Sequence, residues 1–343
     1  MKRFISLLAM LLALAGGRLM SQNVTNVVAR QVGNTVEVTY NIDRAAAVSM
    51  LFSTDGGNTY TTLAQSLTGD IGQVQPGNRK IVWNMLQDAA EWEVARARFK
   101  IMAKDDSRLT FTANGVSFTM VAVQGGTFTM GCTAEQGSDC ESDEKPAHSV
   151  SLNDYFIGQT EVTQGLWKAV MGSNPASFKN GDSYPVETVS WDDCQQFISR
   201  LNSLLSSQLG GKRFALPTEA QWEYAARGGK KSNGYKYAGS NSLSSVGWYT
   251  DNSSSSTHPV AQKAANELGL YDMSGNVWEW CQDWYGSYSR SAQSNPSGAA
   301  SGSGRVLRGG SWDSRARGCR VSFRLINTPS YCGGYYGLRL VCQ

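Results

Sequence analysis

The sequence predicts two domains, a small all-β sandwich over residues 22–106 and a larger irregular α/β domain over residues 117–343. Three observations predict this organisation. The chain has 343 residues, which is more than one ordinary domain needs. Short runs of alternating apolar and polar residues fill the first segment. Beyond Gly239 the chain is rich in Gly, Ser, Asn and aromatic residues and shows little periodicity. Residues 107–116 are expected to be the linker.

The first domain is predicted from its strands and turns. β-Branched and aromatic residues alternate with polar ones, and turn signals at 55–58 and 75–78 separate the runs. Such spacing is typical of an immunoglobulin-like or fibronectin-like sandwich. The segment has no cysteine and no histidine, so we interpret it as a spacer or adhesion-type module. The expected strands cover residues 34–42, 47–53, 79–83 and 93–102.

Residues 1–21 predict a secretory signal peptide. Lys2 and Arg3 precede an apolar run over residues 4–15 that is too short to cross a membrane, and cleavage is expected near Ser21. No cysteine precedes Cys132, so no lipid-anchoring cysteine follows the signal, and no later segment is expected to span a bilayer. The protein is therefore expected to be exported, to the periplasm, the cell surface or the medium.

The charge balance argues against one group of partners. The chain has 31 basic and 28 acidic residues, and loss of Lys2, Arg3 and Arg18 with the signal leaves 28 of each. A mature chain without net charge gives no support to binding of nucleic acid or of an anionic membrane surface. The mean hydropathy of −0.33 is that of a soluble globular chain.

Two helices of the second domain have recognisable N-termini. A capping box, Thr218 with Gln221, opens a helix over residues 219–227. Ser190 opens a second helix, in which apolar residues at helical spacing place Cys194 on the buried face.

Seven cysteines in an exported chain indicate a set of disulfides with one cysteine left over. Two short strands over residues 118–131, joined across Gly125-Gly126, lead into an acidic loop from Cys132 to Glu144. The close spacing of Cys132 and Cys140 indicates that a disulfide closes this loop.

Residues 269–283 combine a turn, two tryptophans and a carboxylate. Trp278 and Trp280 flank Glu279 directly after Ser274-Gly275-Asn276, so carbonyls of the turn and one acid can converge on a point. Calcium takes about six to eight oxygen ligands, including main-chain carbonyls. The alternative is that both tryptophans are core residues and Glu279 caps a neighbouring turn.

Nine short motifs follow one another over the second domain and cover the chain from Phe118 to Gln343. Each motif alone is weakly specific, whereas the ordered set is specific. They are Gly125-Gly-Thr-Phe-Thr-Met-Gly131, Asp143-Glu-Lys-Pro-Ala-His148, Glu161-Val-Thr163, Pro185-Val-Glu-Thr-Val-Ser-Trp191, Leu216-Pro-Thr-Glu-Ala-Gln-Trp-Glu-Tyr-Ala-Ala-Arg-Gly-Gly229, Gly275-Asn-Val-Trp-Glu-Trp280, Arg308-Gly-Gly-Ser-Trp312, Asn327-Thr-Pro329 and Gly337-Leu-Arg339.

This set resembles the formylglycine-generating enzyme, or sulfatase-modifying factor, family. The resemblance implies a compact α/β domain with little regular secondary structure, distantly similar to C-type lectin folds, that binds structural calcium. One calcium site of the family falls on Asp272, Gly275, Val277 and Glu279, with Gly275 and Val277 contributing carbonyls only. The other calcium site of the family does not map, because residues 247–248 lack its asparagine.

The resemblance also locates the family's catalytic centre. Oxidase members hold Cu(I) between two cysteines five positions apart, after Gly-Gly-Ser, and oxidise a substrate cysteine to formylglycine. Here Ser311 matches the motif serine and Cys319 matches the second cysteine, but Ser314 occupies the first cysteine position. Soft thiolates suit Cu(I) and a hydroxyl does not, so copper-dependent formylglycine generation is not expected.

The resemblance further implies two disulfides in the second domain. Cys281 and Cys319 are expected in the same central region and to form one bridge. Cys194 and Cys342 are expected to form another, since each lies close to a position that is bridged in family members. Cys332 is then the cysteine left over.

Iron and hydrolytic chemistry are not expected. The iron-dependent sulfoxide synthases of the family need three histidine ligands, and the chain has only His148 and His258. Ser311 lies among glycines but has no histidine that could act as its base.

Two classes of function remain. The favoured one is an exported, non-catalytic scaffold, stabilised by calcium and disulfides, whose groove binds a peptide, glycan or protein. The alternative is an oxidoreductase of formylglycine-generating type that acts on protein cysteine with a rewired site, such as Cys319 with Cys332.

Overall fold

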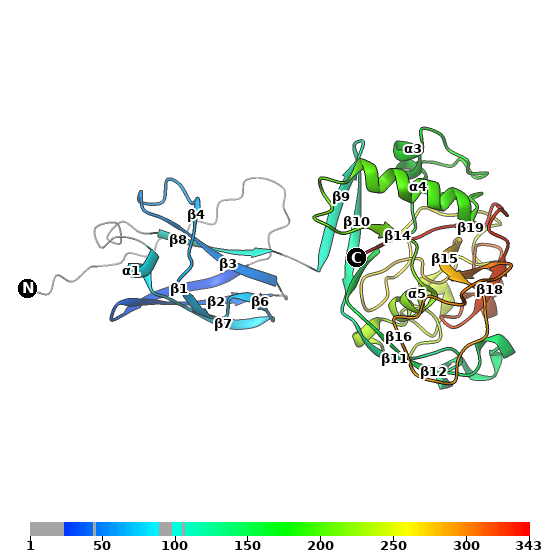
Figure 1. Cartoon of the computed structure of the whole chain (residues 1–343), viewed down its shortest axis with the longest axis horizontal. Helices are drawn as coiled ribbons and strands as arrows, with labels where there is room; N and C mark the ends of the chain where they lie inside the picture. Colours follow the sequence, from blue (N-terminus) through cyan, green and yellow to red (C-terminus); the bar gives the residue numbers. More distant parts are fainter. Residues whose placement is uncertain (1–23, 44–45, 89–97, 105–106) are drawn as a thin grey trace, which may run out of the picture. The chain divides into compact units, whose positions relative to one another are not determined.

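The computed structural model describes residues 24–43, 46–88, 98–104 and 107–343 (Figure 1). The predicted signal peptide lies outside these ranges. The chain divides into an N-terminal unit that ends at Ser107 and a C-terminal unit over Arg108–Gln343. No helix within the described ranges is long and apolar enough to cross a membrane.

Two antiparallel sheets form the N-terminal unit. One has the strand order β1-β2-β7-β5, and in the other β3 pairs with β4, β6 and β8. Their inner faces share one apolar core, in which the rings of Phe52 and Trp83 lie 5.3 Å apart. The elements are β1 (Val24–Val32), β2 (Thr35–Ile42), β3 (Ala46–Ser53), β4 (Thr62–Leu63), β5 (Leu67–Gly69), β6 (Gly72–Val74), β7 (Gly77–Trp83), α1 (Met85–Asp88) and β8 (Arg98–Lys104).

The predicted strands of this unit are present as β2, β3, β7 and the described part of β8. Along β2, buried residues alternate with more exposed ones, as a strand with one covered face requires. An immunoglobulin-like or fibronectin-like topology stays a prediction.

The expected linker over residues 107–116 is wrong for most of its length. Residues 108–113 form β9 (Arg108–Ala113), which pairs with β10 (Val116–Val123) across the turn Asn114-Gly115. Both turn residues have positive φ, 46° and 87°. Asn-Gly is the residue pair that two-residue hairpin turns prefer, so this strand pair could have been read from the sequence.

Three sheets build the C-terminal unit. Their strand orders are β14-β20-β13-β10-β9, β11-β12-β16 and β18-β17-β15-β19. The strands are β11 (Gly126–Met130), β12 (His148–Leu152), β13 (Tyr155–Gly158), β14 (Phe214–Ala215), β15 (Trp278–Trp284), β16 (Gln293–Ser294), β17 (Arg305–Arg308), β18 (Arg324–Asn327), β19 (Tyr336–Gly337) and β20 (Val341–Cys342). The two strands expected over residues 118–131 exist, but they belong to different sheets.

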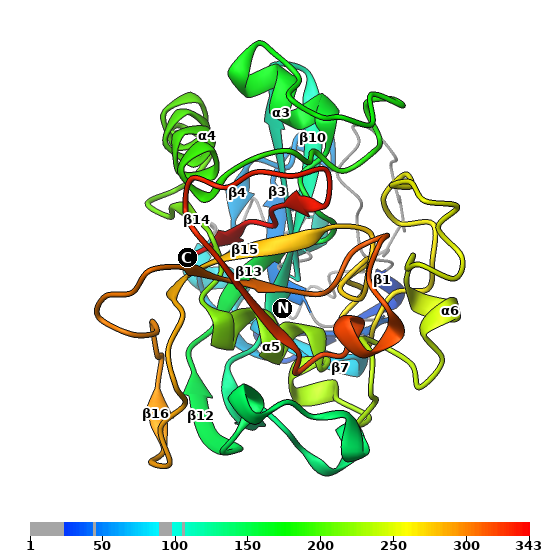
Figure 2. The same cartoon turned by 90° about the vertical axis from the view of Figure 1, so that its right-hand side faces the viewer.

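Short helices cover these sheets. Both predicted capping boxes are present, at Ser190 before α4 and at Thr218 before α5, and Cys194 is buried on α4 as expected. In both views α4 and α5 lie on opposite sides of β15 (Figures 1 and 2). The helices are η1 (Ala134–Asp139), η2 (Ser142–Glu144), α3 (Gln164–Met171), α4 (Trp191–Leu204), α5 (Glu219–Ala226), η3 (Gly229–Lys231), α6 (Leu243–Val246) and η4 (Ala316–Cys319).

Strand β15 separates two kinds of core. Successive side chains of a strand point to opposite faces. Trp278 and Trp280 join the apolar cluster that contains Phe197 and Leu201 of α4. Glu279, Cys281 and Asp283, which alternate with the tryptophans along β15, face α5 and its charged neighbours. The part of residues 269–283 that carries the two tryptophans and Glu279 is therefore a buried central strand.

Candidate functional site

Glu279, which lies between the two tryptophans of β15, is the counter-ion of the buried Arg339. Its carboxylate accepts two hydrogen bonds from Arg339 through Oε1, at 2.7 and 3.0 Å, and one through Oε2 at 2.9 Å. The indole of Trp222 donates to Oε2 at 2.6 Å. All three residues are fully buried. The alternative in which Glu279 caps a turn is not what the structure shows.

Two further carboxylates lie close to this ion pair. Glu161 accepts hydrogen bonds from the side chain of Asn276 at 2.7 Å and from the amide of Val277 at 3.0 Å. Asp272 accepts one bond through Oδ2 from the amide of Ala261, and its Oδ1 is buried with no hydrogen-bond partner. Burial raises the pKa of Asp272 to about 6 and, with the charges of Asp272 and Glu279, holds the pKa of Glu161 well above its usual range.

The residues at this point fit a cation in part. Three buried carboxyl groups face one guanidinium, and an unpaired buried oxygen on Asp272 is the kind of atom that a cation satisfies. Glu279 is different, because Arg339 and Trp222 already occupy both of its oxygens. No group of three His, Cys, Asp or Glu side chains in the described ranges is arranged to hold a metal, so a cation here needs main-chain carbonyls.

Ser314 lies on the loop between β17 and η4, and Cys319 is the last residue of η4. The Ser314 hydroxyl accepts a hydrogen bond from the amide of Ser311 at 2.9 Å, and the two hydroxyls lie 3.1 Å apart. The Cys319 sulfur packs against Gly310 so closely that a side chain at that glycine would collide with it. Cys319 is fully buried, and burial raises the pKa of its thiol to about 12. The thiol is therefore protonated at neutral pH and is a weak nucleophile.

The structure confirms one predicted disulfide and contradicts two. Cys132 and Cys140 are joined. The cysteines of the expected pairs Cys281–Cys319 and Cys194–Cys342 are free thiols.

For the pair Cys281–Cys319, packing in different clusters gives the reason. Cys281 lies on the face of β15 that packs against α5, whereas Cys319 belongs to a separate small cluster with Tyr237. Cys194 and Cys342 share the cluster under α4 as apolar side chains. Burial raises the pKa of all four thiols. Cys332 is also free, and it is the exposed one.

The two histidines have separate structural contacts. The ring of His148 lies 4.9 Å from that of Tyr288, tilted by 53°, and its Nδ1 lies 3.1 Å from the carbonyl of Pro146. His258 stacks on Trp248 at 3.7 Å, and its Nε2 lies 2.8 Å from the carbonyl of Ser253.

Aromatic side chains lie next to Ser314, and sequence reasoning did not single them out. Gly318 lies between Ser314 and Trp278, because a side chain there would contact both. The ring of Trp278 is 6.0 Å from that of Phe323.

The aromatic group continues along the chain beyond β18. Trp312 donates its indole N–H to the carbonyl of Gly334 at 2.9 Å, and the hydroxyls of Tyr331 and Tyr335 lie 3.3 Å apart. Tyr331 is 43% exposed. We call the partly exposed side chains of Trp312, Phe323, Tyr331 and Tyr335 the aromatic face, whereas Trp278 is buried in the core. The dense run of tyrosine and glycine over residues 330–336 was the available signal in the sequence.

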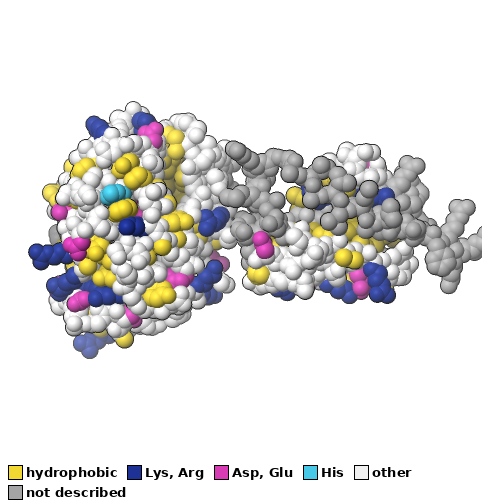
Figure 3. Space-filling model, turned by 180° about the vertical axis from the view of Figure 1, so that it is seen from behind, with side chains coloured by type: hydrophobic (Ala, Val, Ile, Leu, Met, Phe, Trp, Pro, Cys, Tyr) yellow, Lys and Arg dark blue, Asp and Glu magenta, His cyan; other side chains and the backbone are white. Residues whose placement is uncertain are grey.

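Other surface features are unconnected to these residues. A hollow of about 480 Å³ beside the N-terminus of α5 is lined by residues such as Asn153, Gln221 and Gln343, and none of the predicted site residues lines it. Figure 3 shows apolar side chains as separate patches among charged ones on the face it presents. Scattered apolar exposure of this kind is ordinary.

The chain belongs to the sulfatase-modifying factor enzyme 1-like domain family, whose model matches residues 109–343. The match begins at β9 and includes the β15 stretch and the Ser314 loop. The predicted family is therefore confirmed.

Relatives of known sequence and structure agree with this assignment. Chaperone protein LppX of Paenibacillus barcinonensis is 32% identical over 271 residues, covering 66% of this chain and 90% of the relative. A formylglycine-generating enzyme of Streptomyces coelicolor is 31% identical over 288 residues, covering 64% and 87%. The solved structure of Treponema denticola variable protein 1 is 36% identical with a TM-score of 0.62, covering 68% of this chain and 98% of that one.

Proposed function

We propose that this chain is an exported, non-catalytic member of the family that binds a protein, peptide or glycan partner. The observation that carries the proposal is the hydroxyl at Ser314. It engages Ser311 in a local turn, where oxidase members have a thiolate for copper. The remaining thiol, Cys319, is buried and protonated.

The same geometry weighs against a rewired oxidoreductase. A two-thiolate copper site needs both sulfurs ionised and free to approach one metal ion. Cys332 is exposed while Cys319 is fully buried among apolar side chains. No described contact joins them.

The aromatic face supports a binding role. Tyr331 and Ile326 are large side chains left more than 40% exposed, at 43% and 41%. Residues 330–336 read Ser-Tyr-Cys-Gly-Gly-Tyr-Tyr, and tyrosine with serine and glycine is the composition of antibody binding loops, where rigid aromatic side chains supply contact area at low entropic cost. The relatives include both a formylglycine-generating enzyme and a chaperone protein, so members of the family are not all named for one activity.

We also propose structural calcium at Asp272, the carbonyls of Gly275 and Val277, and Glu279. The excess of buried negative charge and the unpaired Oδ1 of Asp272 support it. Asp272 has φ of 57° and Gly275 has φ of 95°, so the chain folds back on itself at this point. Glu279 shares its charge with Arg339, and Asp272 is therefore the ligand on which the site depends most.

Export and an immunoglobulin-like or fibronectin-like N-terminal unit complete the proposal. The charged, apolar and small-residue segments of residues 1–21 support export. The two-sheet core of the N-terminal unit supports a sandwich.

Thiol and copper titrations test the non-catalytic assignment. In the folded protein, Cys332 is expected to be the one thiol that reacts rapidly, and Cu(I) is expected to show no stoichiometric binding that depends on Cys319. Ser314→Cys restores the pair of cysteines and serves as the matched comparison. Two rapidly reacting thiols together with one equivalent of bound copper in the wild-type protein would contradict the proposal.

A further inference from the structure

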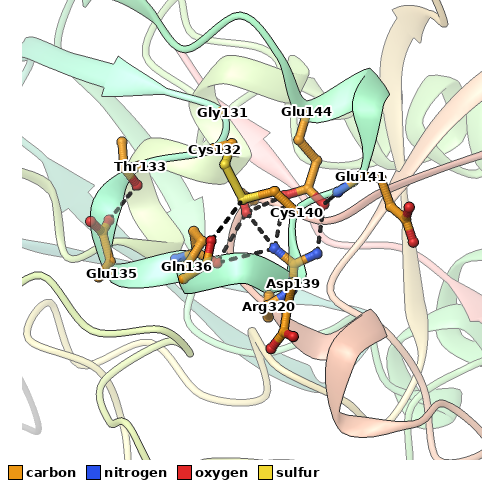
Figure 4. The surroundings of a disulfide bond; sticks show 12 residues. Gly131, Cys132, Thr133, Glu135, Gln136, Asp139, Cys140, Glu141, Glu144 and Arg320 are labelled. Atoms are coloured by element: carbon orange, nitrogen blue, oxygen red, sulfur yellow. Dashed lines mark hydrogen bonds and ion pairs between the residues drawn. A yellow bond between two sulfur atoms is a disulfide. The ribbon is translucent and has the colours of Figure 1, made fainter.

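The loop closed by Cys132 and Cys140 carries several carboxylates that pair with basic residues from distant parts of the chain. The disulfide-closed ring contains the short helix η1, and η2 follows Cys140 and ends at Glu144. The amide of Cys132 donates to the carbonyl of Glu144 at 2.9 Å, so the disulfide and Glu144 lie at the same end of the loop (Figure 4). We call residues 132–144 the acidic loop.

The strongest contact of the acidic loop is a buried ion pair. Arg320 donates to both oxygens of Glu144, at 2.5 and 2.8 Å, and both side chains are fully buried. Ser322 donates to Glu144 at 2.5 Å and to Gln136 at 3.0 Å. Burial opposes ionisation of Glu144, but the hydrogen bonds from Arg320, the Glu141 amide and Ser322 outweigh it and lower its pKa. Removing one partner of such a pair leaves an uncompensated charge in the interior.

Two further pairs join the acidic loop to residues that neighbour Cys319 and Tyr237 in the chain. Arg317, two residues before Cys319, pairs with Glu141 and donates to the carbonyl of Asp139 at 3.1 Å. The side chain of Asp139 pairs with Lys236 at 2.5 Å. Lys236 immediately precedes Tyr237, which packs in the cluster that buries Cys319.

The acidic loop has little regular structure to hold its shape without the cross-link. Helix η1 consists of two short 3₁₀ pieces broken at Gly137, which has a φ of 65°, and η2 is a single 3₁₀ turn. A disulfide restricts the conformations open to such a segment. When the cross-link is lost, the entropic cost of presenting Asp139, Glu141 and Glu144 together rises.

We propose that the acidic loop is a redox-operated clasp over Cys319. With the disulfide intact, its carboxylates hold Arg317 and Arg320, which flank Cys319 in the chain, and Lys236, which precedes Tyr237, so that Cys319 stays packed against the cluster of Tyr237 and Leu243. A dithiol reductant transfers two electrons and two protons to Cys132–Cys140, leaving two thiols and its own disulfide. The acidic loop then loosens, η4 moves away from that cluster together with Cys319 at its end, and the thiol becomes accessible.

Pulse labelling of thiols in the full chain tests the clasp. Cys332→Ser removes the exposed thiol, and N-ethylmaleimide incorporation at each cysteine is measured by mass spectrometry before and after mild dithiothreitol treatment. Labelling of Cys319 is expected to rise about ten-fold or more on reduction, as for a locally opened segment. Labelling of Cys194 and Cys281, which pack in other clusters, is expected to stay within about two-fold.

Two variants separate the clasp from general unfolding. Glu144→Gln, with the disulfide intact, is expected to raise Cys319 labelling because Arg320 loses its charged partner. Asp182→Asn breaks an exposed pair with Lys168 elsewhere in the same unit and is expected to leave labelling unchanged. The proposal is overturned if Cys319 stays protected both after reduction and in Glu144→Gln, or if Cys194 and Cys281 become reactive together with it.

Discussion

In the described part of the N-terminal unit, the buried side chains are apolar apart from Ser53, whereas the C-terminal unit buries carboxylates and arginines throughout. The eight buried carboxylates outnumber the four buried arginines. The comparison teaches that two parts of one chain can reach a packed interior by different means. The buried acids are Glu144, Glu161, Glu187, Glu219, Glu223, Asp272, Glu279 and Asp283, and the arginines are Arg308, Arg320, Arg324 and Arg339.

The charged core of the C-terminal unit ties together elements that are distant in sequence. Arg308 of β17 pairs with Glu223 of α5, and Arg324 of β18 donates two bonds of 2.7 Å to Glu219. Short strands and single-turn helices have few backbone hydrogen bonds of their own. Bidentate arginine–carboxylate pairs fix their positions instead, because their geometry is specific.

Breaking a buried pair should have the largest effect and should be confined to the C-terminal unit. Arg308→Met leaves Glu223 and Glu219 with one arginine partner each, and we expect a loss of about 3 kcal/mol in the free energy of unfolding. Lys168→Met, which breaks a pair that is 52% and 69% exposed, should cost under about 1 kcal/mol. Hydrogen exchange resolved by segment measures both. Equal losses of unfolding free energy in the two variants would show that the buried pair stabilises the fold no more than the exposed pair does.

Calcium removal should also separate the two units. At a free calcium concentration of about 100 times the dissociation constant, binding stabilises by about 3 kcal/mol, so chelation should lower the melting temperature of the C-terminal unit and leave exchange in residues 35–83 unchanged.

Asp272→Asn is the matched variant for this prediction. It should reduce the response to chelator more than Glu279→Gln does, because Glu279 also pairs with Arg339. If chelator leaves the melting temperature of the wild-type protein unchanged, the proposed calcium site is contradicted.

The pH dependence of stability should reveal the ionisation of Asp283. Burial, with the charge of Glu219, raises the pKa of this carboxyl from its ordinary 3.8 to about 7. Between about pH 4 and 7 the folded chain keeps the proton that the unfolded chain has lost, so the contribution to stability falls as pH rises through this window.

Asp283→Asn should remove this fall, which at about 1.4 kcal/mol per pKa unit amounts to roughly 4 kcal/mol over the whole window and to roughly 3 kcal/mol of it above about pH 5. The amide oxygen still accepts the bond from the Glu219 amide that Asp283 accepts at 3.0 Å. Chemical denaturation at pH 5 and pH 8 measures the difference. Parallel pH profiles for the two proteins would contradict the assignment.

The smallest effect should come from the N-terminal unit. Ile81 is fully buried in its apolar core, and Ile81→Val deletes one methyl group at a cost of about 1 kcal/mol. Only exchange in the N-terminal segments should accelerate. A pH-dependent loss in this variant would show that the apolar core of this unit is coupled to titrating groups.

The N-terminal unit was predicted from the alternation of apolar and polar residues, and the C-terminal unit from short motifs and capping boxes. Each kind of signal left some elements unpredicted. Alternation alone found β2, β3 and β7, because an apolar core leaves a period-two trace. It missed β9 and α3, although Asn114-Gly115 marks the hairpin and Thr163 caps the helix with a bond from the amide of Leu166. Local turn and cap residues therefore predict β9 and α3, which alternation does not.

The candidate site was predicted in part for physical reasons. Capping boxes and the loop disulfide are local, so residues three to eight positions apart reveal them. The pairs Arg339–Glu279 and Arg320–Glu144 join residues 60 and 176 positions apart, and no sequence period records them. The two wrong disulfides came from the resemblance, since it placed the cysteines in one region without fixing the faces they occupy.

The central claim is that the Ser314 loop performs no copper-dependent oxidation, and one measurement tests it directly. The purified full chain, supplied with copper and oxygen, is incubated with a Cys-x-Pro-x-Arg peptide, and the peptide is examined by mass spectrometry. We predict that the cysteine is recovered unchanged. Conversion of that cysteine to formylglycine by the wild-type chain, and its loss in Cys319→Ser, would contradict the account.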